Sequence, residues 1–164
     1  MFTKLFEGPI IFLLRPACPL NYLKIYGAKM SLIVQKFGGT SVADPERIMN
    51  VAKRVAKTYD QGNDVVVILS AMAGVTDTLI GMAQKVTDSP NNRELDVLLA
   101  TGEQTTCALL AMSLNSMNYP AQSLMGHQVE VVTNHCFGNA RILDIKSHRI
   151  RELLDKRQIG RAHV

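Results

Sequence analysis

A lysine directly before two glycines is the clearest chemical signal in the sequence. Lys36 and Phe37 precede Gly38 and Gly39, at the end of a short apolar run. Because glycine has no Cβ, backbone N–H groups here can approach an anion closely, while the lysine ammonium supplies a mobile positive charge. This arrangement predicts a phosphate cradle. The spacing leaves a second interpretation open, in which a glycine turn joins a strand to a helix and Lys36 is an ordinary surface lysine.

A second turn carries two hydroxyl groups around a glycine. Ser70 and Thr76 flank Gly74, directly after the apolar run Val65–Leu69. Hydroxyl groups on a flexible turn are suited to hydrogen-bonding a small polar ligand. In the alternative interpretation, Ser70 or Thr76 simply caps the helix that follows.

A carboxylate stands between two runs of helical pattern. Glu103 follows Gly102, with residues 94–100 before them and residues 104–117 after them. Near a helix N-terminus, this carboxylate could bind an amino group. The alternative is that Glu103 only complements the helix dipole.

The elements that position these residues alternate between strand and helix. A strand is predicted at 32–37, and Asp44 and Pro45 mark the start of a helix as its N-cap and first residue. One face of that helix is apolar, formed by Ile48, Val51, Ala52, Val55 and Tyr59. Val65–Leu69 is a continuous β-branched and aliphatic run, typical of a strand buried on both faces of a parallel sheet. Ligands bind at the carboxyl ends of such strands, where both turns lie.

The rest of the chain continues this α/β pattern. A helix is predicted from Asp77, with Leu79, Ile80, Ala83 and Val86 on its inner face. The further predicted elements are helical runs at 94–100 and 104–117, strands at 121–125, 129–133 and 142–145, and a helix at 148–156. We therefore predict an α/β fold with a mostly parallel sheet and helices on both faces.

The positive charge of the chain lies at its two ends. The 164 residues include 18 Lys and Arg against 14 Asp and Glu, a formal net charge of +4. Residues 1–29 and Arg161 account for this excess, because residues 30–159 hold 13 basic and 13 acidic side chains. This neutral body carries no basic stripe or aromatic stacking platform, so we expect no nucleic-acid partner. The 47% hydrophobic content excludes a disordered or fibrous chain.

The cysteines and the apolar runs indicate the cellular compartment in which we expect the protein. Cys18, Cys107 and Cys136 form no C-x-x-C pair and have no histidine at metal-ligand spacing. They predict neither a disulfide framework nor a metal site, and they favour a reducing cytoplasm. The longest uncharged apolar run near the start, residues 9–14, is too short to span a bilayer, so we expect no membrane segment.

The two ends of the chain differ from its body. Residues 1–29 contain three prolines and show no helical or strand period, whereas a clear pattern begins at Met30. We expect residues 1–29 to be upstream sequence or a disordered leader, with a secretory signal as the alternative. Sequencing the mature N-terminus tests this, and a protein that begins at Met1 would contradict it. Residues 160–164 are expected to be a non-native tail.

Taken in order, the motifs of residues 30–159 resemble those of the aspartate kinases, in particular the monofunctional type. The resemblance rests on Lys36–Val42, Leu69–Asp77, Arg93–Asp96, Thr101–Gln104 and Gly138–Ile142. It implies the amino-acid kinase fold and transfer of the ATP γ-phosphoryl to the side-chain carboxylate of L-aspartate. The product would be 4-phospho-L-aspartate, in the first step of lysine, threonine and methionine biosynthesis.

The resemblance also implies roles for particular residues. Lys36 is the expected catalytic residue, neutralising phosphate charge in the transition state. It would bind ATP, with Mg²⁺, together with Phe37, Gly38 and Gly39. The expected contacts with L-aspartate come from Ser70, Thr76 and Glu103, the last through the α-ammonium group.

The resemblance further implies that the chain is the N-terminal, acceptor-binding half of the kinase domain. We expect the parent enzyme to be a homo-oligomer. The chain alone is expected to be inactive and aggregation-prone, because an uncovered sheet edge and apolar face would remain. Monodisperse protein with measurable ADP release would contradict this. Two alternatives stay open: a non-catalytic amino-acid- or anion-binding module of the same fold, and a related enzyme that phosphorylates glutamate or a nucleotide.

Overall fold

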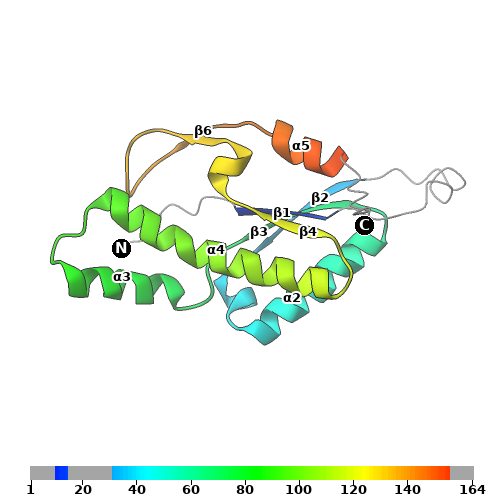
Figure 1. Cartoon of the computed structure of the whole chain (residues 1–164), viewed down its shortest axis with the longest axis horizontal. Helices are drawn as coiled ribbons and strands as arrows, with labels where there is room; N and C mark the ends of the chain where they lie inside the picture. The colour runs from blue at the N-terminus through cyan, green and yellow to red at the C-terminus, as the bar shows by residue number, and fades with distance from the viewer. Residues whose placement is uncertain (1–9, 15–30, 156–164) are drawn as a thin grey trace, which may run out of the picture.

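The computed structural model describes residues 10–14 and 31–155, arranged as a sheet between layers of helices (Figure 1). One side of the sheet packs against α2 and α4, and the other packs against α5. In chain order the elements are β1 (Ile10–Leu14), β2 (Leu32–Phe37), a 3₁₀ helix (Gly39–Val42), α2 (Pro45–Asp60), β3 (Asp64–Leu69), α3 (Val75–Val86), α4 (Asn92–Ser116), β4 (Ala121–Leu124), a second 3₁₀ helix (Gly126–Val129), β5 (Val131–Thr133), β6 (Ile142–Ile145) and α5 (His148–Asp155).

The main sheet has the strand order β2-β3-β1-β4. β2 and β3 are parallel, while β1 is antiparallel to both β3 and β4, so β2, β3 and β4 all run in the same direction. β5 and β6 form a separate antiparallel pair. The predicted α/β fold, with a sheet covered by helices on both faces, is confirmed.

β1 is a strand where the sequence pattern predicts none. Residues 1–29 show no helical or strand period in their sequence, but Ile10–Leu14 form a strand. Five consecutive apolar residues without alternation are typical of a strand buried on both faces, which explains how this short run can enter the sheet. The rest of 1–29, and residues 160–164, lie outside the described residues. The natural start at Met30 stays a prediction.

The helix after the first glycine turn forms as its sequence predicts. The Asp44 carboxylate accepts a hydrogen bond from the backbone N–H of Arg47 at 2.8 Å, and Pro45 occupies the first helical position. The helix ends before Gly62, whose φ of +86° suits the reversal of the chain. All five residues of the predicted apolar stripe are buried against the sheet. The cap and the stripe together set the position of α2 relative to β2.

The region around Gly102 differs from the sequence prediction. α4 is one continuous helix from Asn92 to Ser116, where two separate runs are predicted. Gly102 does not end the helix. Glycine is required here for packing, because a Cβ would lie 3.0 Å from the Ala71 Cβ and 3.2 Å from Val75 Cγ1. Glu103 consequently lies in the middle of α4, away from the N-terminus of its own helix.

Smaller differences concern α3 and the last strands. α3 begins at Val75, two residues before Asp77, and it buries no residue completely; Val86, predicted to face inward, is 85% exposed. A 3₁₀ helix occupies Gly126–Val129, so the strand predicted at 129–133 is shorter. In α5, the predicted inner residues Ile150, Leu153 and Leu154 are buried.

One helix of the described residues, α4, is long and apolar enough to cross a bilayer by length and composition alone. Its residues Leu110 and Leu114 are completely buried in the core shared with α2 and β3. A core helix can meet the same criterion, so α4 alone is weak support for a membrane span. The expectation of no membrane segment stays a prediction.

Candidate functional site

The two glycine turns meet at the carboxyl ends of β2 and β3. The backbone N–H of Ser70 donates a hydrogen bond to the Phe37 carbonyl oxygen over 3.2 Å. Gly39 lies so close to the second turn that a Cβ on it would approach the Ala71 carbonyl oxygen to 2.9 Å. Parallel strands place their carboxyl ends at one edge, which is why segments 30 residues apart in sequence become neighbours.

α4 brings Glu103 to the same edge. Gly102 packs against Ala71 and Val75 of the second turn, and Glu103 is the next residue. The Glu103 side chain is almost completely buried, at 8% exposure. Burial raises the pKa of the Cys107 thiol, one helical turn further on. The negative charge of Glu103 raises this pKa further, as a smaller contribution. The structure therefore joins three of the predicted motifs: the first turn, the second turn and Gly102-Glu103.

The second turn does not cap α3 through a hydroxyl group. Gly74 is the N-cap residue, with a φ of +77°, and no side chain accepts a hydrogen bond from the first turn of the helix. Ser70 and Thr76 are both half-buried. The capping interpretation of these two residues is wrong, because the left-handed N-cap position is occupied by glycine.

Lys36 and Phe37 point to opposite faces of the sheet. Phe37 is buried in the core beneath α2 and α4, together with Val42 and Leu69. Since side chains alternate along a strand, exposed Lys36 lies on the other face, at the same carboxyl end. A Cβ on Gly38 would meet nothing within 4 Å, so the backbone there is open to an approaching group.

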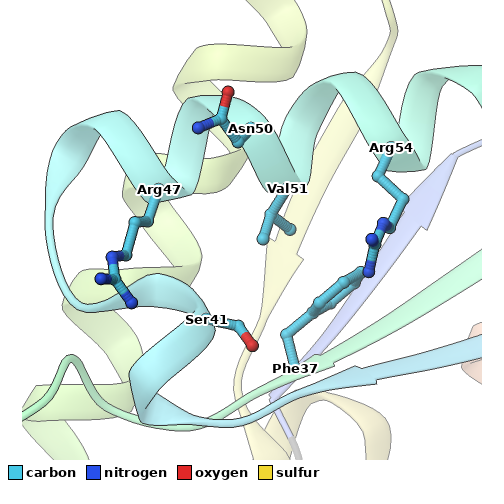
Figure 2. Close-up of a pocket in the computed structure, with 6 residues that line it drawn as sticks. All are labelled: Phe37, Ser41, Arg47, Asn50, Val51 and Arg54. Atoms are coloured by element: carbon cyan, nitrogen blue, oxygen red, sulfur yellow. The ribbon is translucent and has the colours of Figure 1, made fainter.

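A pocket of about 290 Å³ lies between the first turn and the start of α2 (Figure 2). It is lined by Phe37, Ser41, Arg47, Asn50, Val51 and Arg54. Of the predicted site residues, it includes Phe37 alone. Arg47 Nη1 donates to the Thr40 carbonyl oxygen at 2.6 Å, and its Nε lies 3.3 Å from Asp44 Oδ2.

Sequence reasoning missed this pocket. Arg47 and Arg54 are seven residues apart in α2 and so lie on one helix face. That spacing, beside the first turn, is the signal that could have found them. The predicted substrate residues Ser70, Thr76 and Glu103 lie outside the pocket.

The described residues contain no cluster of three or more histidine, cysteine, aspartate or glutamate side chains that could hold a metal ion. Mg²⁺ in nucleotide-using enzymes is commonly bound by substrate phosphates and only one or two carboxylates.

The contact between the turns predicts that alanine at position 39 destabilises the fold, whereas alanine at position 38 has little effect on stability. Gly39→Ala should lower the free energy of unfolding by about 1–3 kcal/mol, since the new methyl group clashes with the Ala71 carbonyl. Gly38→Ala is the matched control: its φ of −79° suits alanine and the space is open, so a change below about 1 kcal/mol is expected. Urea unfolding followed by circular dichroism measures both. Equal destabilisation by the two variants would contradict the proposed contact.

The sequence of most of this chain is similar to that of known proteins. Residues 31–160 match the amino acid kinase family. The chain belongs to this family. Among the relatives of this chain, the aspartokinase of Geobacillus stearothermophilus is 52% identical over 127 residues, which are 77% of this chain and 31% of the relative. The aspartate kinase of Pseudomonas putida is 52% identical over 122 residues, covering 74% of this chain and 30% of the relative.

A solved structure is also similar to this chain. The crystal structure of aspartate kinase from Synechocystis superposes with a TM-score of 0.52 at 50% identity, over 53% of this chain and 15% of that chain. The chain spans about a third of the length of the curated relatives that it matches.

Proposed function

We propose that this chain is the acceptor-binding part of an aspartate kinase, in which Lys36 neutralises charge on the transferring phosphoryl group. The observation that carries the proposal is the meeting of Gly39, Ala71 and Gly102 at one sheet edge, in a chain about half identical to proteins named aspartokinase. A related enzyme for another acceptor is less favoured, because the sequence relatives named above are all kinases of aspartate.

The proposed reaction is a direct phosphoryl transfer. An oxygen of the aspartate side-chain carboxylate forms a bond to the γ-phosphorus of ATP. The bond between that phosphorus and the β–γ bridging oxygen breaks, and ADP leaves. No protein nucleophile is required, since positioning and charge neutralisation supply the catalysis in such transfers.

The residues of the edge would divide this work. Lys36 would neutralise charge on the transferring phosphoryl group, and the backbone N–H groups of Gly38 and Gly39 would donate beside it. Ser70 and Thr76 would orient the acceptor through their hydroxyl groups. Glu103, which α4 brings to this edge, would bind the α-ammonium group of aspartate. When bound with ATP, Mg²⁺ would neutralise phosphate charge.

Three further points belong to the proposal. The product, 4-phospho-L-aspartate, would enter lysine, threonine and methionine biosynthesis. The parent enzyme would be a homo-oligomer. A cytoplasmic location is favoured by Cys107 and Cys136, which form no disulfide within the described part of the chain.

A chimeric enzyme tests the proposal. Residues 31–160 replace the matching segment of the Geobacillus stearothermophilus aspartokinase, and ADP release is measured with each acceptor. We expect ADP release that depends on L-aspartate, and background release with L-glutamate. The 164-residue chain alone should release no ADP. A folded chimera that binds L-aspartate without ADP release would instead support a binding module.

A further inference from the structure

The arginine-lined pocket between the first turn and α2 takes no part in the proposed reaction. The first turn forms one wall of the pocket through Phe37 and Ser41. The backbone N–H of Ser41 donates to the Gly38 carbonyl oxygen over 2.9 Å, which folds the turn back toward the helix. Residues of α2 spaced three or four apart share one face of the helix and form the other wall. They are Arg47, Asn50, Val51 and Arg54.

The pocket combines an apolar surface with polar groups. Val51 belongs to the buried apolar stripe of α2, and Phe37 is buried in the same core. Arg47 and Arg54 lie beside that stripe on the exposed part of the helix. Figure 2 shows the two arginines on two sides of the pocket, with the Ser41 hydroxyl group between them. A ligand in the pocket would therefore meet apolar side chains and positive charge together.

The lining has hydrogen-bond donors in excess of what the protein uses. It includes two arginines and no acidic residue. Arg47 is held from one side, because its Nη1 donates to the Thr40 carbonyl oxygen at 2.6 Å and its Nε lies 3.3 Å from Asp44 Oδ2. Within the described part of the chain, Arg47 Nη2 and the side chains of Asn50 and Arg54 have no protein partner. These groups can donate to a bound anion without breaking a contact in the fold.

Volume and charge narrow the class of ligand. The volume of about 290 Å³ is at the lower end of the range of small-molecule sites, about 300–1,000 Å³. A phosphate monoester carries a charge of about −1.5 to −2 at pH 7, which matches the two guanidinium groups. Planar guanidinium groups bind phosphate oxygens through paired N–H donors. The apolar side chains of Phe37 and Val51 suit an apolar or aromatic group on the same ligand.

We propose that this pocket binds a small phosphate monoester that carries an apolar or aromatic group. The phosphate lies between Arg47 and Arg54, and the organic group packs against Phe37 and Val51. The site is separate from the expected phosphate cradle, because the exposed Lys36 lies on the other face of the sheet and the two glycines of the first turn do not line the pocket. The proposal is independent of the kinase function, since it rests only on the groups that line the pocket.

Titration of the full chain with phenyl phosphate, followed by NMR, tests the site residue by residue. We expect saturable shifts of the Asn50 side-chain amide, with a Kd in the millimolar range. Arg54→Met should raise this Kd by about 10-fold, because it removes one charge-assisted contact. Lys53→Met is the matched control: it removes an exposed charge from the same helix outside the pocket and should leave the Kd unchanged. Absence of a saturable shift, or equal Kd values in the two variants, would overturn the proposal.

Two further titrations test the location and the ligand class. In Lys36→Met, the shifts of Asn50 should persist with the same Kd, whereas their loss would assign the binding to the phosphate cradle and overturn the proposal. Benzoate has a single negative charge and should bind about 10-fold more weakly than phenyl phosphate. Binding of benzoate with equal or higher affinity would contradict a site for phosphate monoesters.

The chimeric kinase tests whether the pocket is accessible in a complete enzyme, and it also decides the case in which the 164-residue chain aggregates. Isothermal titration calorimetry of the chimera with Lys36→Met should detect binding of phenyl phosphate. Addition of Arg54→Met should weaken this binding by about 10-fold, and addition of Lys53→Met should not change it. A chimera that binds no phenyl phosphate, or binds it equally with and without Arg54, would overturn the proposal.

Discussion

Replacing Lys36 with methionine in the chimeric kinase should lower kcat by about 10²- to 10³-fold, the loss typical of removing one charge-stabilising group. Methionine keeps the length and flexibility of the side chain but removes the ammonium group. Because the charge on the phosphoryl group is greatest in the transition state, kcat should fall while the KM for L-aspartate changes by less than about 3-fold. Steady-state kinetics with a coupled ADP assay measure both constants.

The matched control for Lys36 is Lys57→Met in the last turn of α2. Lys57 is also exposed, but it lies at the end of the helix away from both turns. We expect kcat of this variant to remain that of the unmodified chimera. Equal kcat values for Lys36→Met and Lys57→Met would remove Lys36 from the mechanism.

Glu103→Gln should raise the KM for L-aspartate by about 10²-fold, because an ammonium group would lose a buried charged partner. Glutamine preserves the size of the side chain, so packing against the second turn is retained. The interaction is the same in the ground state and in the transition state, and kcat at saturating L-aspartate should change little. The KM for ATP, measured in the same experiments, should also stay constant.

Glu46→Gln is the matched control for Glu103. Glu46 is an exposed carboxylate in the first turn of α2, so its neutralisation should leave the KM for L-aspartate unchanged. A normal KM for L-aspartate in Glu103→Gln would contradict the assigned role. A rise in the KM for ATP of the same size would point to damage of the whole edge.

Local sequence signals predicted the part of the fold that positions the first turn. The Asp44 cap and the apolar stripe of α2 are short-range patterns, and both are present in the structure. The approach of the two turns also followed from sequence, because carboxyl ends of parallel strands share one edge. The contact between Gly39 and Ala71 is the result.

Long-range packing accounts for what the sequence pattern could not predict. Gly102 resembles a helix break in sequence, and only the neighbouring Ala71 explains why glycine is required inside α4. The apolar run of β1 is a strand that pairs with β3 and β4, which are distant from it in sequence. Likewise, the arginine-lined pocket depends on how the first turn folds against α2.

The exposed face of β2 bears on the expected behaviour of the isolated chain. Leu32 and Val34, on the face away from α2, are 51% and 57% exposed. β2 is also an edge strand of the sheet. An apolar edge strand favours association with other chains, which is consistent with the predicted tendency to aggregate.

Trapping the product with hydroxylamine tests most directly whether this edge binds the acceptor of an aspartate kinase. An acyl phosphate on the aspartate side chain reacts with hydroxylamine to form β-aspartohydroxamate, which mass spectrometry identifies. The chimera is predicted to form this hydroxamate from L-aspartate only when ATP is present. A chimera that is folded and consumes ATP, yet yields no β-aspartohydroxamate, would contradict the proposed function.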